Sequence, residues 1–394
     1  MQSTIKRCTL AIIMCGLSAI GMAQEKLIDE DFTDLTVPPT TWTTSYCTIL
    51  TKLGGIDISA LRVEKNSTSG TTKGYAITPC FEYDGDVILS FKYINTTVNN
   101  SKVKLSVTKG VSFDGYDNPH SFDITNHYNN GWKTATYRIT NATSTTRVKF
   151  ALDSDNYFAI DDVVVTKDIL SENADNQYYI AAHEGNATDV QTTRTLIGGI
   201  WNTLCLPFNV TKETMEAALG KNQDIQMRTF SSYADNVMTF DAVADDAVIT
   251  AGTPFLIKLN TTFTNPTFNS VTVSNSTAAQ TVTRGDVSFI GTYSKKELAT
   301  DGTELFITTS GGLAIPTTNG NVMNGMRAYI KVPESMKFTP NGVRLAIDNE
   351  TTSIQSVTTT SQPDAVYNLS GQRLQQPRKG LNIVRKNRKL IFIR

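Results

Sequence analysis

Residue types that active sites commonly use are scarce in this chain of 394 residues, which has three histidines. His183-Glu184 is not followed by the second histidine of a helical zinc-protease motif. The sequence contains no GxSxG nucleophile elbow, P-loop, GxGxxG fingerprint or CxxC pair. Carboxylates are abundant, so a glycosidase pair stays open, but no segment singles out two of them. This scarcity predicts a protein that is not an enzyme.

Cysteine is also scarce. Beyond the first 23 residues the chain keeps Cys47, Cys80 and Cys205. Three is an odd number for an oxidising compartment. A disulfide between Cys47 and Cys80 stays open. Cys205 lies in the apolar run 200–208, where a buried free thiol is the simplest interpretation.

Long hydrophobic runs are missing except at the start. Lys6 and Arg7 precede an uncharged run that ends in Gly21 and Ala23, which is the pattern of a secretory signal peptide over residues 1–23. We expect cleavage near Ala23, and a lipoprotein signal at Cys15 is the rival interpretation. The run is shorter than the roughly 20 residues that a membrane span needs. We therefore predict no transmembrane span.

Charge is unevenly distributed along the chain. From Ala365 onward there are eight Lys and Arg residues and no acid, whereas the whole chain has a net charge of -1. The remainder is therefore acidic. An acidic body with a basic tail argues against nucleic acid as a partner.

Short alternating runs indicate an all-β protein. Turn dipeptides such as Asp84-Gly85 and Asn341-Gly342 separate them and tolerate the positive φ of tight hairpins. One helix is predicted between Thr211, as N-cap, and Gly220, as the C-terminal stop. The clearest alternating runs are 87–93, 103–107 and 148–152.

Polar stretches at 167–177 and 349–364 divide the chain. We predict a first domain at 24–168, a second at 169–350, a polar linker at 351–364 and a tail at 365–394. The expected architecture is a jelly-roll β-sandwich, a second β-rich, sandwich-like domain and a short C-terminal β-meander.

The first domain resembles the jelly-roll modules grouped with cleaved-adhesin and choice-of-anchor domains of secreted bacterial proteins. The resemblance covers about 140 residues and implies a β-sandwich that binds sugar or protein, often with a structural calcium. It rests on the order of several motifs: Leu27-Ile-Asp-Glu-Asp-Phe32, Trp42, Tyr75-Ala-Ile-Thr-Pro79, Val87-Ile-Leu-Ser-Phe-Lys-Tyr93, Gly131-Trp132 and Tyr157-Phe-Ala-Ile-Asp-Asp-Val-Val-Val165.

The last of these motifs contains a physical conflict. Strict alternation puts Asp162 on one face of the strand and Asp161 on the other, so either buried face carries an acid. Such an acid must be paired, protonated, bound to a metal or re-aimed by a bulge. We hypothesise a structural calcium held by some of Asp29, Asp31, Asp161 and Asp162. The alternative places these acids at strand ends in water or on backbone hydrogen bonds.

A stretch rich in aromatic, Asp and Asn residues spans 113–132. Tyr116, His120, His127 and Tyr128 could stack on a sugar and hydrogen-bond its hydroxyls. The alternative is a mobile surface loop, with Trp132 in the core.

The second domain is similar to a β-rich region that recurs before the tails of secreted proteins in the same bacterial group. No chemistry follows from that likeness. Its motifs, at 200–208, 251–258, 287–293 and 326–332, have the composition of core strands and turns.

The tail is similar to the type A C-terminal sorting domain of type IX secretion, which the outer-membrane export machinery reads. The positions that match include Gly371, Gly380 and Lys389. Two depart from the common pattern, since Asn382 stands where Tyr is usual and Arg394 where Lys is usual. The alternative is a three-strand meander docked on the second domain. The matching segments are Val366-Tyr-Asn-Leu-Ser-Gly-Gln-Arg-Leu374, Lys379-Gly-Leu-Asn-Ile-Val384 and Lys389-Leu-Ile-Phe-Ile-Arg394.

Together these features predict a secreted or cell-surface, adhesin-like binding protein. Its jelly roll would bind a glycan or a surface protein, and its tail would direct outer-membrane export. The first alternative is a structural cell-surface component without a discrete ligand site. The second is a glycan-degrading enzyme on a sandwich scaffold.

Overall fold

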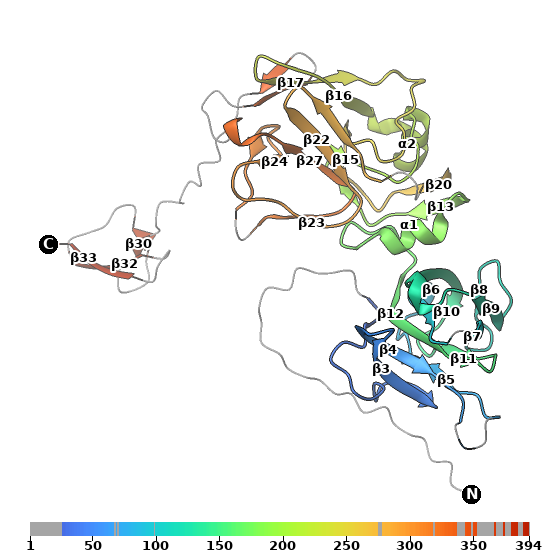
Figure 1. The fold of residues 1–394 in the computed structure, drawn as a ribbon. Helices are drawn as coiled ribbons and strands as arrows, with labels where there is room; N and C mark the ends of the chain where they lie inside the picture. Colours follow the sequence, from blue (N-terminus) through green and yellow to red (C-terminus); the bar gives the residue numbers. More distant parts are fainter. Residues whose placement is uncertain are drawn as a thin grey trace, which may run out of the picture. The chain divides into compact units, whose positions relative to one another are not determined.

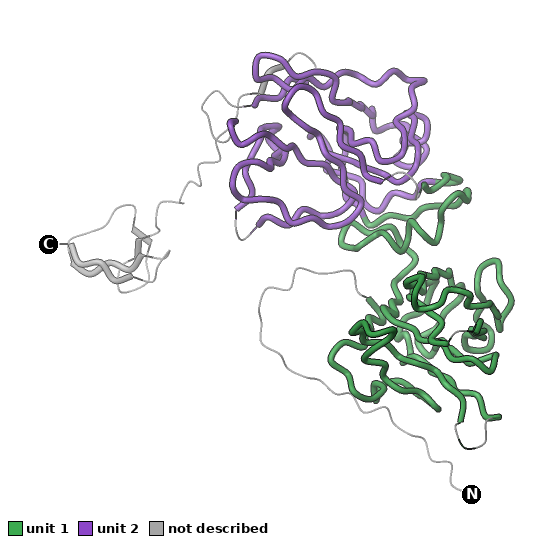
Figure 2. The backbone as a smooth tube through the Cα atoms, viewed as in Figure 1, with its two compact units in different colours: residues 1–193, 269–275 green, residues 194–268, 276–394 purple. Residues whose placement is uncertain are grey.

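The computed structural model describes residues 26–66, 68, 71–97, 99–274, 278–317, 320–336 and 343–347, with the backbone of the strands at 350–352, 366–367, 373–374, 380–384 and 389–393. The predicted signal peptide, 1–23, lies outside the described residues. The chain forms two compact units, one of residues 1–193 with 269–275 and the other of residues 194–268 with 276–394 (Figure 2).

The first unit is a β-sandwich of a seven-stranded and a five-stranded sheet (Figure 1). All strand pairs within these two sheets are antiparallel. The larger sheet has the order β3 (Cys47–Leu53), β4 (Ile56–Val63), β12 (Phe158–Lys167), β6 (Gly85–Asn95), β10 (Lys133–Ala142), β8 (Ser112–Phe113), with β1 (Ile28–Glu30) also on β12. The smaller has the order β2 (Thr43–Ser45), β5 (Tyr75–Ile77), β11 (Val148–Leu152), β7 (Ser101–Val107), β9 (His120–Ile124).

One hydrophobic core fills the space between these sheets, as the jelly-roll prediction requires. The alternating runs predicted at 87–93, 103–107 and 148–152 are confirmed as β6, β7 and β11. In each of these strands every second side chain points into that core. Trp42 stacks on Phe150 within this core, with ring centroids 6.4 Å apart.

A bulge resolves the conflict in the last strand of the sandwich. The register of β12 against β6 shifts between Asp161 and Val164, and Asp162 takes a φ of 47° there. Beyond the bulge Val163 and Val165 enter the core. The extra residue reverses the alternation, so no acid is carried into the core.

The first unit continues beyond the predicted boundary at 168. α1 (Gln177–His183) and β13 (Ala187–Gln191) follow, and β13 pairs with β20 (Thr267–Thr272). The physical reason is a buried contact, because the imidazole of His183 lies 2.6 Å from the carboxylate of Asp168. No motif in the sequence predicted α1. A 3-10 turn, η1 (Tyr128–Asn130), lies between β9 and β10.

The second unit is also β-rich and has its own core, which includes Phe230, Phe240 and Phe289. β17 and β28 pair in parallel. One sheet has the order β15 (Trp201–Leu204), β18 (Phe255–Lys258), β16 (Gln226–Ala234), β17 (Val237–Ala242), β28 (Arg344–Ile347), β29 (Glu350–Thr352). The other has the order β21 (Thr281–Arg284), β22 (Val287–Thr292), β27 (Arg327–Lys331), β24 (Glu304–Ile307), β25 (Leu313–Ala314). Smaller elements are β14 (Thr195–Leu196) with β19 (Phe263–Thr264), β23 (Lys296–Glu297) with β26 (Val322–Met323), η2 (Lys221–Gln223) and η3 (Glu334–Met336).

The predicted helix is present as α2 (Lys212–Leu219). The Thr211 side chain accepts a hydrogen bond from the Thr214 backbone N–H, and the N–H of Gly220 donates to the Glu216 carbonyl. Both caps act as the sequence predicts, since each satisfies a backbone group that the helix end leaves unpaired.

The three cysteines of the described residues are all free thiols. Cys205 is buried, as predicted, and donates to the Gly252 carbonyl at 3.2 Å. Cys47 donates to the Tyr75 carbonyl at 3.2 Å, and Cys80 is exposed. The disulfide that the sequence left open is not formed.

The C-terminal strands form a four-stranded antiparallel sheet in the order β31 (Arg373–Leu374), β30 (Val366–Tyr367), β32 (Gly380–Val384), β33 (Lys389–Ile393). The predicted C-terminal sheet is therefore present. Its order differs from a strict meander because β32 pairs with β30. No helix among the described parts of the chain is long and apolar enough to cross a membrane.

Candidate functional site

An aromatic cluster lies at one edge of the sandwich. We call it the edge cluster: Tyr93, Tyr116, His120, Phe122 and Tyr137. His120 and Phe122 come from β9, the edge strand of the smaller sheet, and Tyr116 follows β8, the edge strand of the larger sheet. Two residues of the predicted sugar-binding stretch, Tyr116 and His120, therefore meet here.

The rings of the edge cluster contact one another closely. The Tyr116 ring centroid lies 4.6 Å from that of His120 and 5.2 Å from that of Tyr137. His120 stacks on Phe122 at 5.9 Å with an interplanar angle of 23°. Phe122 meets Tyr93 edge-on at 5.4 Å. Exposure is graded, since Tyr116 is 50% exposed and Tyr137 is 8% exposed.

The loop that carries Tyr116 is held from within the sandwich. The Asn118 side chain accepts from the Val107 N–H at 3.2 Å and donates to the carbonyls of Val107, at 3.2 Å, and Val111, at 3.0 Å. The Tyr116 N–H donates to the Phe113 carbonyl at 3.4 Å. These bonds fix the backbone beside an exposed ring, which lowers the entropy lost when that ring binds a partner.

The polar atoms of the edge cluster are unused by the protein. Within the described residues, no hydrogen bond joins the hydroxyls of Tyr93, Tyr116 and Tyr137 or the imidazole of His120 to another group. Fully buried tyrosine hydroxyls usually find a partner, but the Tyr137 oxygen is not one of the fully buried unpaired atoms, so it stays open to a ligand. Burial, with smaller contributions from Tyr116 and Tyr93, raises the pKa of Tyr137. The Tyr137 hydroxyl therefore stays protonated at neutral pH and can donate as well as accept.

His127 and Tyr128, the other two predicted ligand-binding residues, lie elsewhere. The Nδ1 atom of His127 is 2.9 Å from the Thr97 carbonyl oxygen. Tyr128 packs in a small second cluster that includes Trp132 and Leu53. Trp132 thus packs against this cluster and not against the main core, where the mobile-loop alternative placed it.

Sequence reasoning missed three members of the edge cluster. Phe122 carried a usable signal, because it lies two residues after His120 and so shares its face of a strand. Tyr93 and Tyr137 alternate with core residues and give the pattern of ordinary core positions. Only the pairing of strands that are far apart in sequence places these two side chains beside an exposed edge of the sandwich.

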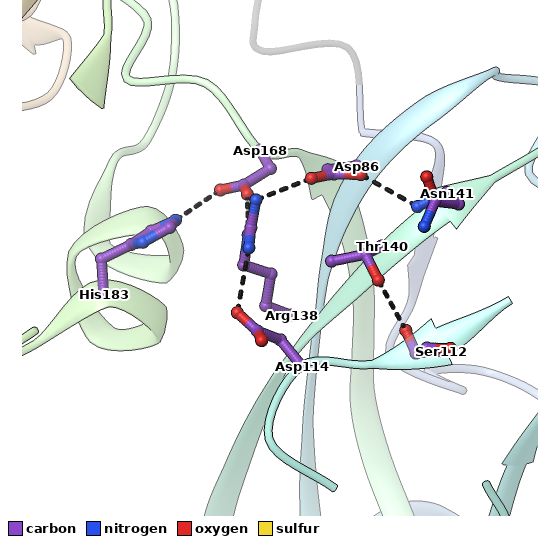
Figure 3. A network of polar contacts seen from close by, with 8 residues as sticks. All are labelled: Asp86, Ser112, Asp114, Arg138, Thr140, Asn141, Asp168 and His183. Atoms are coloured by element: carbon purple, nitrogen blue, oxygen red, sulfur yellow. Dashed lines mark hydrogen bonds and ion pairs between the residues drawn. The ribbon is translucent and has the colours of Figure 1, made fainter. Parts of the chain in front are cut away.

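The polar groups on the opposite face of β10 are arranged very differently. Arg138 donates through Nη1 to Asp114 at 2.9 Å, through Nη2 to Asp86 at 2.6 Å and through Nε to Asp168 (Figure 3). Asp168 also contacts His183. We call these five residues the Arg138 network. Burial raises the pKa of Asp168, but His183 and then Arg138 outweigh it and hold that pKa below its usual value.

The four acids predicted to hold calcium have separate surroundings. Asp29 pairs with Lys26 at 2.8 Å, and Asp162 pairs with Lys92 at 2.6 Å. Asp161 accepts from the Asp162 N–H, and burial, opposed by that bond, raises its pKa to about 6.

The fourth acid, Asp31, accepts from the Thr33 N–H at 2.9 Å. Among the described residues, no group of three or more His, Cys, Asp or Glu is placed to hold a metal ion. Calcium therefore stays a prediction.

The predicted sorting positions are only partly described. Gly380 begins β32 and Lys389 begins β33. Gly371 and Arg394 lie outside the described residues.

No protein-family model and no curated protein matches the sequence. Similar solved structures include the K3 cleaved-adhesin domain of Lys-gingipain from Porphyromonas gingivalis W83, at 15% identity, covering 36% of this chain and 99% of that chain, with a TM-score of 0.27.

Two further similar structures carry carbohydrate-binding names. The CBM22-1 xylan-binding domain of Xyn10C from Paenibacillus barcinonensis has 10% identity, covers 36% of this chain and 95% of that chain, and has a TM-score of 0.28. A family 35 carbohydrate-binding module from Clostridium thermocellum has 17% identity, 36% and 97% coverage, and a TM-score of 0.25. Because these identities and TM-scores are low, the assignment of the fold of the first unit rests on its own strand order and hydrophobic core.

Proposed function

We propose that the first unit is a non-catalytic glycan-binding module and that the edge cluster is its binding site. The support is chemical. A sugar ring presents C–H faces and hydroxyls together, and the edge cluster presents aromatic faces beside hydroxyl and imidazole groups.

The observation that carries this proposal is the set of unpaired hydroxyls on Tyr93, Tyr116 and Tyr137. A purely structural aromatic cluster needs no polar atoms, and phenylalanine would serve it equally well. Polar groups left without a partner beside exposed rings are instead what a hydroxyl-rich ligand requires.

A glycan array probed with the whole chain tests the proposal. We expect binding to at least one glycan class and loss of that signal in Tyr116→Ala, because the most exposed ring of the cluster is removed. Tyr46→Ala, at another exposed tyrosine of the same unit, is the matched control and should bind as the wild type does. A blank array would favour the structural cell-surface component.

We also propose that the protein reaches the cell surface, with residues 1–23 as a secretory signal and 365–394 as the sorting tail. Support comes from the basic, acid-free composition of the tail and from its small separate sheet. Deleting 365–394 in the producing cell should abolish surface display while the remaining chain stays folded. Unchanged display would remove the sorting role.

A further inference from the structure

A cavity lies within the second unit, remote in sequence from the edge cluster. Its volume is about 310 Å³, which is at the lower end of the range for small-molecule sites. Residues of β15, β24, β26 and β27 and of the segment 320–324 line it. We call its apolar lining residues the apolar wall and its uncharged polar lining residues the polar wall.

The apolar wall includes Phe306, Ile307 and Val322. Phe306 and Ile307 are half-buried, and Val322 at the rim is 56% exposed. An exposed valine beside a half-buried phenylalanine leaves an apolar surface that water contacts. Covering such a surface with the C–H face of a ligand is favourable.

The polar wall includes Thr203, Asn321 and Asn324. The amide nitrogen of Asn321 donates to Glu297 at 2.9 Å and to the Leu298 carbonyl at 3.3 Å, which fixes the side chain. Within the described residues, the Asn321 oxygen and the whole Asn324 amide have no hydrogen-bond partner. One wall therefore offers both acceptors and donors.

The backbone around Asn324 is held tightly. The Met326 N–H donates to the Tyr293 carbonyl at 3.2 Å. A Cβ atom on Gly325 would lie 2.4 Å from that same Tyr293 oxygen, so only glycine fits this approach. Asn324 is thus presented by a fixed backbone, and preorganised polar groups bind with a smaller entropic cost.

We propose that this cavity is a second ligand site, for one or two units of a neutral saccharide. A wholly apolar ligand would leave the two asparagines unpaired, at a cost. The described residues that line the cavity include no acid and one cation, Arg327, so a cationic ligand finds no counter-charge. Arg327 already interacts with another group, so the site does not depend on an anionic ligand. A sugar ring satisfies both walls, with its C–H face on Phe306 and its hydroxyls on the amides.

Saturation-transfer NMR on the full chain tests this site, with glucose, galactose, mannose, N-acetylglucosamine and their disaccharides as probes. We expect at least one sugar to bind with a dissociation constant of about 1 mM. Asn324→Ala should weaken that binding about tenfold, and Phe306→Ala should do the same. Phe263→Ala, at a half-buried phenylalanine of this unit outside the cavity, should leave it unchanged.

The Asn324→Ala variant keeps the test decisive if Phe306→Ala fails to fold, since the Asn324 side chain supports no internal hydrogen bond. The signal should also survive Tyr116→Ala, which separates this site from the edge cluster. Binding that persists in Asn324→Ala and in every folded Phe306 variant, or no binding by any of these sugars, would overturn the proposal.

Discussion

Tyr137 and Arg138 are neighbours on β10 and point to opposite faces of the same sheet. Arg138 has three carboxylate partners. The hydroxyl of Tyr137, within the described residues, has no partner although the side chain is 8% exposed. One strand thus carries a polar group with three partners and, within the described residues, a polar group with none.

This contrast separates structural from binding roles. A buried charge must be paired, so the Arg138 network is what folding requires at that position. The Tyr137 hydroxyl is not one of the fully buried unpaired atoms, so it costs the fold little and is open to a hydrogen bond from a ligand. Binding sites are therefore better sought among unsatisfied polar atoms near a surface than among the strongest polar networks.

The largest expected effect comes from removing the arginine at the centre of the Arg138 network. Arg138→Met leaves the buried Asp168 carboxylate with His183 as its remaining partner. We expect the free energy of unfolding of the first unit to fall by about 3–5 kcal/mol. Hydrogen exchange of the β6 and β10 amides, measured by mass spectrometry, reports that loss locally.

Arg62→Met is the matched control. The Arg62 side chain is 30% exposed, against 29% for Arg138, but it pairs with one acid, Glu64. Its loss should cost about 1 kcal/mol or less. Equal losses in the two variants would contradict a special role for the network.

Calcium removal is the next test, because a bound ion would give Asp161 a positive partner, whereas the structure gives it a hydrogen bond from the Asp162 N–H. If calcium present at 100 times its dissociation constant is held there, a chelator removes about 2.7 kcal/mol of stability. We expect a lower melting temperature with chelator and no such change in Asp161→Asn. A melting temperature that chelator does not move removes the calcium prediction.

The bulge in β12 gives a somewhat smaller effect. Asp162→Val places a β-branched residue at a φ of 47° and removes the ion pair with Lys92. We expect a loss of about 2 kcal/mol in denaturant unfolding. Asp162→Asn tolerates the same backbone conformation and should lose well under half as much. Similar losses in both would show that the ion pair, and not the backbone, dominates.

Local patterns predicted much of this fold. The alternation at 87–93 identified β6, and Thr211 with Gly220 bounded α2, because those signals depend on residues close in sequence. From the sequence, the bulge at Asp162 was one of several ways to avoid an unpaired acid in the core. The register of β12 against β6 decides among them, and local patterns do not reveal that register. The edge cluster needed the packing of strands far apart in sequence.

The pH dependence of stability gives the smallest effect, measured with chelator present. The Asp161 pKa of about 6 lies above its usual value, so the folded state binds this proton more tightly than the unfolded state. Its contribution to stability therefore falls as the pH rises from about 4 to about 6. Asp161→Asn should remove this fall in stability. At pH 7 the variant should be about 1 kcal/mol more stable than the wild type, a small gain because the Asp161 carboxyl is partly exposed to solvent. A variant with the unchanged pH slope would contradict this assignment.

The most direct test of glycan binding at the edge cluster is Tyr137→Phe, with affinity and melting temperature measured on the same samples. The substitution keeps the ring and removes one hydroxyl that makes no internal hydrogen bond. We expect affinity for the glycan found on the array to fall about fivefold, or about 1 kcal/mol, with an unchanged or slightly higher melting temperature. Unchanged affinity would contradict a binding role for this hydroxyl, and a clearly lower melting temperature would show that it serves the fold instead.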